Sequence, residues 1–183
     1  MRNLIYAYLL LCLLGSACDT ARNNFESIQV DERYEIALPT HMEAVNDLNQ
    51  EASLQYQNAS KEMYIIIIDE PLEDLIDTFT QLGKYDKELS DVENYRNIQL
   101  GFLKEDMSVV EKGKTRALEV NGLQAELVHL EGAISDTNEQ IAYLAGFLTS
   151  DTRAYMIMAW TLENNKEKHM DTFEQMIRSF KEI

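Results

Sequence analysis

Carboxylate side chains gather in two stretches of the chain, and carboxylates can bind cations or transfer protons. The two clusters consist of Glu70, Glu73, Asp74 and Asp77, and of Asp86, Glu88, Asp91 and Glu93. Asp74 and Asp77 stand one turn apart if the segment is helical, so the pair could share a cation or a proton. The ligand spacing of an EF-hand is missing, and negative charge near a helix N-terminus is favourable in itself. We therefore interpret both clusters as solvated faces and keep cation binding as the alternative.

The three histidines show no spacing that favours a metal or a catalytic site. His41, His129 and His169 fall in an expected turn, strand and helix, without an HExxH pattern or a cysteine partner. The sequence also lacks the GxSxG, P-loop and GxGxxG motifs. We therefore expect structural or solvent-exposed histidines, and we predict no catalytic residue, no cofactor and no metal site.

Four aromatic residues in the last third of the chain could line a ligand cleft: Tyr143, Phe147, Tyr155 and Trp160. Their parity along two expected strands puts Tyr143 and Phe147 on one face. Trp160 shares a face with Met156 and Met158, whereas Tyr155 points to the other side. Core packing is the favoured interpretation, and a ligand cleft is the alternative.

The first eighteen residues suggest a covalent modification. Arg2 is the only charge before an apolar run from Leu4 to Leu14, which is too short to cross a membrane. The run leads through small residues to Cys18 and resembles the lipobox of bacterial lipoproteins, with Gly15 where the large apolar residue usually stands. The resemblance implies a signal peptide at 1–17 and lipid attached to the Cys18 thiol. A plain secretory signal cleaved after Ala17, or an uncleaved leader, are the alternatives.

Lipidation of Cys18 would exclude a disulfide and cysteine catalysis, because Cys12 lies inside the leader. Each buried methylene of an acyl chain contributes about 0.8 kcal/mol, so two or three chains anchor a protein durably. Residues 18–26 are then a lipidated cysteine and a short polar tether. Within it, Asp19-Thr20-Ala21 resembles a bacterial O-glycan acceptor at Thr20. The expected location is the bacterial cell envelope, with the domain tethered to a membrane.

The charge of the chain restricts its partners. The formal net charge is −16, and removal of residues 1–17 would take away one further positive charge, that of Arg2. Phosphate backbones and anionic lipid repel so acidic a surface, so we expect no nucleic-acid binding. A lipid anchor would supply the membrane attachment that this surface charge cannot.

Hydrophobic periodicity predicts alternating groups of strands and helices after the tether. The expected strands are 28–38, 52–56, 63–68, 109–110, 117–120, 123–130, 141–148 and 154–162. Asp69 and Pro71 mark the start of a helix that Gly83 ends. A helix with a less regular apolar pattern is expected over 85–103, and one with a clear apolar stripe over 170–180. Residues 40–49 are expected to form a turn or a short helix, and Asn121-Gly122 indicates a tight hairpin. This order predicts an α+β fold, with helices packed on an antiparallel sheet, over residues 27–183.

Several of these segments are similar to the PsbP/Mog1-like family. They are Tyr34–Pro39, Ala52–Tyr56, Asn121-Gly122-Leu123 and the closing run from Phe173 to Lys181. The resemblance implies an α/β/α sandwich and a non-catalytic binding or assembly module, and it carries no site residue with it. The expected function is therefore a membrane-tethered envelope lipoprotein that docks on another envelope component. A carrier of a small ligand or cation, and an unrecognised enzyme, are the alternatives.

Overall fold

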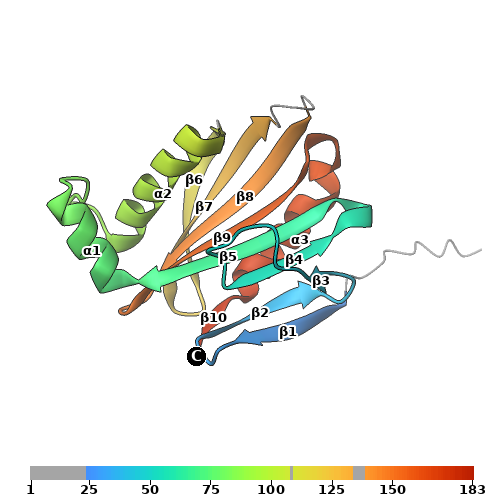
Figure 1. Ribbon diagram of the computed structural model, residues 1–183, viewed down its shortest axis with the longest axis horizontal. Coiled ribbons are helices and arrows are strands. Elements are labelled where there is room, and N and C mark those ends of the chain that lie inside the picture. The colour runs from blue at the N-terminus through green and yellow to red at the C-terminus, as the bar shows by residue number, and fades with distance from the viewer. Residues whose placement is uncertain (1–23, 108, 134–138) are drawn as a thin grey trace, which may run out of the picture.

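A computed structural model describes residues 24–107, 109–133 and 139–183. Over these residues the chain forms a seven-stranded antiparallel sheet, a small three-stranded sheet and three α-helices. Helices α1 and α2 cover one face of the large sheet, while α3 and the small sheet cover the other (Figure 1). The predicted α+β class, with helices on both faces of an antiparallel sheet, is confirmed.

The large sheet has the strand order β3-β4-β5-β9-β8-β7-β6. Its strands are β3 (Glu43–Ala44), β4 (Leu54–Asn58), β5 (Met63–Pro71), β6 (Val110–Val120), β7 (Leu123–Ala133), β8 (Gln140–Thr149) and β9 (Arg153–Leu162). The run Ile65–Ile68 lies in the interior of the sheet because β5 pairs with β4 on one side and β9 on the other. The predicted hairpin at Asn121-Gly122 is confirmed, and both of its residues adopt the positive φ that such a turn requires.

The small sheet corrects the prediction of one long strand over 28–38. Strand β1 (Phe25–Val30) turns back through 31–33 into β2 (Tyr34–Pro39), and β10 (Lys181–Glu182) pairs with the other edge of β2. Asp31 and Glu32 carry the turn with φ of 47° and 55°. Val30 and Tyr34 are direct cross-strand partners, so their side chains share a face. The apolar alternation therefore continues through the turn and looks like a single strand.

The helices are α1 (Leu72–Gln81), α2 (Asp91–Met107) and α3 (Lys166–Ser179), with short 3₁₀ turns at Ala59–Lys61 and Glu163–Asn165. Strand β5 runs on through Asp69 to Pro71, so α1 begins later than predicted, and β4 lies two residues after its predicted start. Strand β6 is one strand with an irregularity between Lys112 and Arg116, where two separate fragments were predicted. The segment expected to be a turn or short helix contains bends and the two-residue β3.

Each face of the large sheet has its own hydrophobic core. One core lies between the large sheet and helices α1 and α2 and includes Leu75, Tyr95, Phe147 and Met156. The other lies between the large sheet and α3 with the small sheet, and it includes Tyr155. Full burial of one large apolar side chain contributes about 1.5–3 kcal/mol. Helix α3 packs closely on the sheet at Gly146, where an added Cβ would stand 2.8 Å from Ile177 Cγ2. Glycine is therefore what allows this close packing.

A buried carboxylate joins the two sheets. Asp69 near the end of β5 has a side chain only 1% exposed, and its Oδ2 accepts hydrogen bonds from Arg33 and Arg153. Arg33 comes from the turn between β1 and β2, whereas Arg153 begins β9. Asp69 Oδ1 and Arg153 Nε are buried without a hydrogen-bond partner among the described residues. We call this group the Asp69 joint.

Candidate functional site

The predicted lipidation site at Cys18 and the possible glycan site at Thr20 lie outside the described residues. The first described residue, Asn24, accepts a hydrogen bond from the Thr40 backbone N–H at 2.8 Å. Strand β1 already includes Phe25 and Glu26, so any tether is shorter than the predicted 18–26. None of the described helices has the length and apolar character needed to cross a membrane.

The histidines lie on the α3 side of the molecule or at its surface. His129 is exposed on β7, while His41 and His169 are half-buried, and the pKa of each of these two is lowered. Burial is the main cause, and the nearby positive charge of Lys61 adds to it. Within residues 24–107, 109–133 and 139–183, no three His, Cys, Asp or Glu side chains are placed to hold a metal ion.

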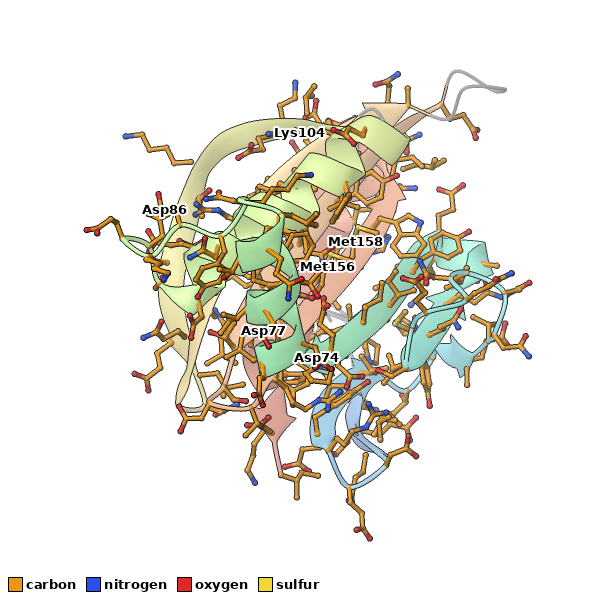
Figure 2. All side chains as sticks on the ribbon, turned by 60° about the vertical axis from the view of Figure 1, so that its left-hand side comes forward. Asp74, Asp77, Asp86, Lys104, Met156 and Met158 are labelled. Atoms are coloured by element: carbon orange, nitrogen blue, oxygen red, sulfur yellow. The ribbon has the colours of Figure 1, made fainter. Side chains whose placement is uncertain are left out.

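Most members of the two carboxylate clusters lie at one corner of the molecule, whereas Glu70 is half-buried on β5. Asp74 and Asp77 are exposed on α1, and Asp86 is exposed in the segment that leads to α2 (Figure 2). Glu93 has a structural role, because its Oε2 accepts from the Ser90 backbone N–H at 2.9 Å and from the Ser90 hydroxyl at 2.6 Å. These bonds form a capping box at the start of α2 and lower the pKa of Glu93.

Large apolar side chains are exposed among these carboxylates. Leu82, just after α1, is 61% exposed, and Phe102 on α2 is 39% exposed. Phe102 packs at a tilt near Phe79 with ring centroids 6.1 Å apart, and Lys84 Nζ stands 5.7 Å from its ring centre. A shallow groove of about 300 Å³ runs beside it. We call α1, the 82–90 connection and the exposed side of α2 up to Glu105 the acidic corner (Figure 2).

The predicted aromatic set separates into core residues and residues at a cavity. Phe147 and Tyr155 are fully buried, on opposite faces of the sheet, and Tyr155 lies on the other face from Met156, as its parity predicted. Trp160 is half-buried and lies directly across from Tyr64 on β5 and Tyr143 on β8. Its ring centre is 5.4 Å from that of Tyr64, with nearly parallel planes, and 6.3 Å from that of Tyr143. We call these three rings the aromatic row.

A cavity of about 220 Å³ adjoins the aromatic row. Its lining consists of Glu62, Tyr64, Glu139, Ile141, Trp160, Thr161 and Leu162. Glu62 is held in place because its Oε2 accepts a hydrogen bond from Asn165 Nδ2 at 2.6 Å. Sequence reasoning singled out Trp160 but missed Tyr64, because Tyr64 stands in a run that looked buried on both faces.

A larger cavity of about 510 Å³ lies on the other side of the sheet, between β6, β7, β8 and the start of α3. The lysines that line it form ion pairs with Glu131: Lys112 Nζ lies 2.8 Å from Glu131 Oε2, and Lys166 Nζ lies 3.6 Å from Glu131 Oε1. Lys166 in turn pairs with Glu163. The lysines of this cavity are therefore already engaged with carboxylates of the same chain.

Comparisons with known proteins support the fold. No protein-family model matches the sequence, and no curated protein sequence is significantly similar to it. Among solved structures, the cyanobacterial PsbP (CyanoP) of Synechocystis is 12% identical with a TM-score of 0.59, over 93% of this chain and 99% of CyanoP. LpqN, involved in cell envelope biogenesis of Mycobacterium tuberculosis, is 10% identical with a TM-score of 0.52, over 87% of this chain and 90% of LpqN.

A third solved structure is the Ran-binding protein Mog1p of Saccharomyces cerevisiae. It is 10% identical, with a TM-score of 0.49, over 86% of this chain and 95% of Mog1p. Identities this low relate the chain to CyanoP and LpqN in fold alone. The likeness to CyanoP and LpqN spans nearly the whole described domain, and the chain has the expected PsbP/Mog1-like α+β fold.

Proposed function

We propose that this protein is a lipid-tethered accessory module of the bacterial cell envelope that docks on another envelope protein through its acidic corner. The partner surface is basic at its edge and has an apolar centre. The observation that carries the proposal is the exposure of Leu82 and Phe102 within a strongly acidic surface. Catalysis has no part in the proposal.

The acidic corner has the make-up of a protein interface, in which a partly apolar centre is surrounded by a polar rim. Between Glu70 and Glu93 the sequence contains eight acidic residues and two lysines. Such a surface speeds encounter with a basic partner, and the apolar side chains supply the binding energy once contact is made. Phe102 is suited to a central role because burial of an aromatic ring dominates many interfaces.

The envelope location is supported by the lipobox resemblance at Cys18. LpqN, which shares the fold, is involved in cell envelope biogenesis, and a comparable setting is proposed for this chain. Cys18→Ala tests the anchor: the variant should leave the membrane pellet, whereas wild type should remain in it after washing with salt. A variant that stays in the pellet would refute lipidation at Cys18.

Photo-crosslinking in intact cells tests the docking surface. A crosslinking residue at position 102 should capture a defined partner, and peptide mapping should place the crosslink on a basic segment of that partner. Leu82→Ser should reduce capture strongly. Ile183→Ser is the matched control, because Ile183 is 60% exposed at the small sheet, which covers the opposite face of the large sheet from α1 and α2 (Figure 1). Equal loss from both substitutions, or a crosslink to an acidic segment, would contradict the proposal.

A further inference from the structure

The aromatic row stands on a part of the large sheet that the helices leave open. Helix α1 contacts β5 and β9 near the end of β5, where the Leu72 backbone N–H donates to the Thr152 carbonyl at 2.9 Å. Helix α2 packs over β7 and β8. Tyr64 lies at the beginning of β5, the end remote from α1, and Trp160 lies beside it near the end of β9. Half-buried rings therefore reach the surface there.

The row differs from an ordinary aromatic core cluster in its register. Tyr64, Trp160 and Tyr143 are direct partners across three neighbouring strands, so their rings project from the same face in one line. Phe147, by contrast, meets the ring of Tyr95 from α2 edge to face, and both rings are fully buried. Tyr143 is only 6% exposed, whereas Tyr64 and Trp160 are half-buried, so these two rings keep π surface available to a ligand.

The cavity beside the row combines π surface with negative charge. Among the described residues that line it, Glu62 and Glu139 are the charged ones, and none is a lysine or an arginine. Asn165 orients Glu62 at the wall, while Ile141 and Leu162 supply apolar surface. Aromatic faces attract cations through their quadrupole, and neighbouring carboxylates add to that attraction. An anion would meet only repulsion from these two carboxylates.

We propose that this cavity binds an organic cation: a quaternary ammonium group, or the ammonium or guanidinium head of a basic side chain. The rings of Tyr64 and Trp160 form one wall, and Glu62 and Glu139 carry the opposing charge. A volume of about 220 Å³ suits the head of such a group rather than a drug-sized molecule. The acidity of the whole chain attracts cations toward this site. This inference does not depend on docking at the acidic corner.

Trp160 provides a direct readout because it is the only tryptophan of the chain. Choline and 3,3-dimethylbutan-1-ol have nearly the same shape, but only choline carries a positive charge. Titration of each into the purified domain should change Trp160 fluorescence, and choline should bind about threefold to thirtyfold more tightly. Equal affinity for the two probes, or no saturable change with choline, would overturn the proposal.

Variants separate a binding role from a structural one. Tyr64→Leu and Glu62→Gln should each weaken choline binding by about threefold or more, whereas Tyr64→Phe should bind nearly as wild type because it keeps the ring. Tyr56→Leu is the matched control, since Tyr56 lies on the neighbouring strand β4 and packs against the core on the opposite face. Thermal unfolding of each variant shows that it is folded. Loss of binding in Tyr56→Leu to the same degree would count against the site.

The source of the cation can be resolved in the same assay. Short peptides that are blocked at both ends, and whose only charge is one central lysine or arginine, should compete with choline if the site takes basic side chains. Tighter binding of these peptides identifies a partner's side chain as the ligand, and tighter binding of choline identifies a small ammonium compound. Failure of both peptides and choline to bind would refute the proposal, while docking through Phe102 would remain testable by crosslinking.

Discussion

The Asp69 joint and the acidic corner use the same kind of side chain for opposite purposes. Asp69 is 1% exposed and holds two arginines between the two sheets. Asp74 and Asp77 are exposed on α1, and no ion pair is found for either among the described residues (Figure 2). A buried charge that loses its partner costs several kcal/mol, whereas a solvated charge costs almost nothing. Environment, rather than residue type, therefore decides which aspartates maintain the fold.

The largest difference between the two regions should appear when each loses one negative charge. Asp69→Asn takes the counter-charge from Arg153 and leaves Arg33 only its exposed partner Asp31, so it should lower the free energy of unfolding by about 3 kcal/mol. Asp77→Asn, on exposed α1, should change it by less than about 0.5 kcal/mol. Urea denaturation at neutral pH measures both. Similar values for the two variants would show that the joint contributes little.

Packing should distinguish the core beneath α3 from the acidic corner at the level of a single methyl group. Gly146→Ala places a Cβ 2.8 Å from Ile177 Cγ2 and 3.3 Å from Leu127 Cδ2, so the Ile177 side chain, or α3 with it, must shift. Overpacking of this kind should cost about 1–3 kcal/mol of stability. A double-mutant cycle with Ile177→Ala tests the cause, because removal of Cγ2 should relieve much of the cost. If the two substitutions change the free energy of unfolding additively, contact with Ile177 is not the cause of the cost.

The same change at the acidic corner should have the opposite sign. Gly101 lies in α2, and an added Cβ there would meet nothing within 4 Å. Gly101→Ala should therefore stabilise the protein by about 0.5–1 kcal/mol, because glycine loses more backbone entropy in a helix than alanine does. Thermal unfolding checks the sign, and a destabilised variant would indicate that α2 is less regular than described.

The fold was largely predictable because its signals are local. Four consecutive isoleucines, Ile65–Ile68, indicate an interior strand, and Asn121-Gly122 indicates a tight turn. The turn at Asp31 and Glu32 has a weaker signal, since aspartate tolerates positive φ but glutamate is an unusual choice for it, and no glycine is present in this turn. A three-residue loop also preserves the parity of the flanking side chains, which hid the hairpin in the alternation.

The candidate sites were predictable only where the chain itself gathers residues. The acidic corner arises from sequence neighbours and was visible as two clusters. Asp69 was interpreted only as part of a helix start, because its partners come from positions 36 and 84 residues away. Tyr64 likewise meets Trp160 only through the pairing of β5 with β9. Long-range strand pairing leaves no periodic mark in a single sequence, so the Asp69 joint and the aromatic row required the structure.

Glu70 lies between the two regions and should give the smallest and most specific effect. It follows Asp69 on β5 but points to the α2 side, where Gln99 Nε2 donates to its Oε1 at 3.1 Å. Burial raises the pKa of Glu70, and the charges of Glu51 and Asp69 add to the rise, although the nearby Tyr95 hydroxyl and the hydrogen bond from Gln99 oppose it.

A raised pKa means that the folded state holds this proton more tightly than the unfolded chain does. The contribution of Glu70 to stability is therefore complete below the ordinary glutamate pKa and falls as the pH rises through the raised value. Glu70→Gln has no proton to lose, so wild type should lose stability relative to this variant between about pH 4 and pH 7. Urea denaturation at both pH values measures the difference, with Glu73→Gln on α1 as the control for one lost charge. A constant difference across this range would mean that Glu70 is solvated like the carboxylates of the acidic corner, and the boundary between the two regions would then lie at Asp69 itself.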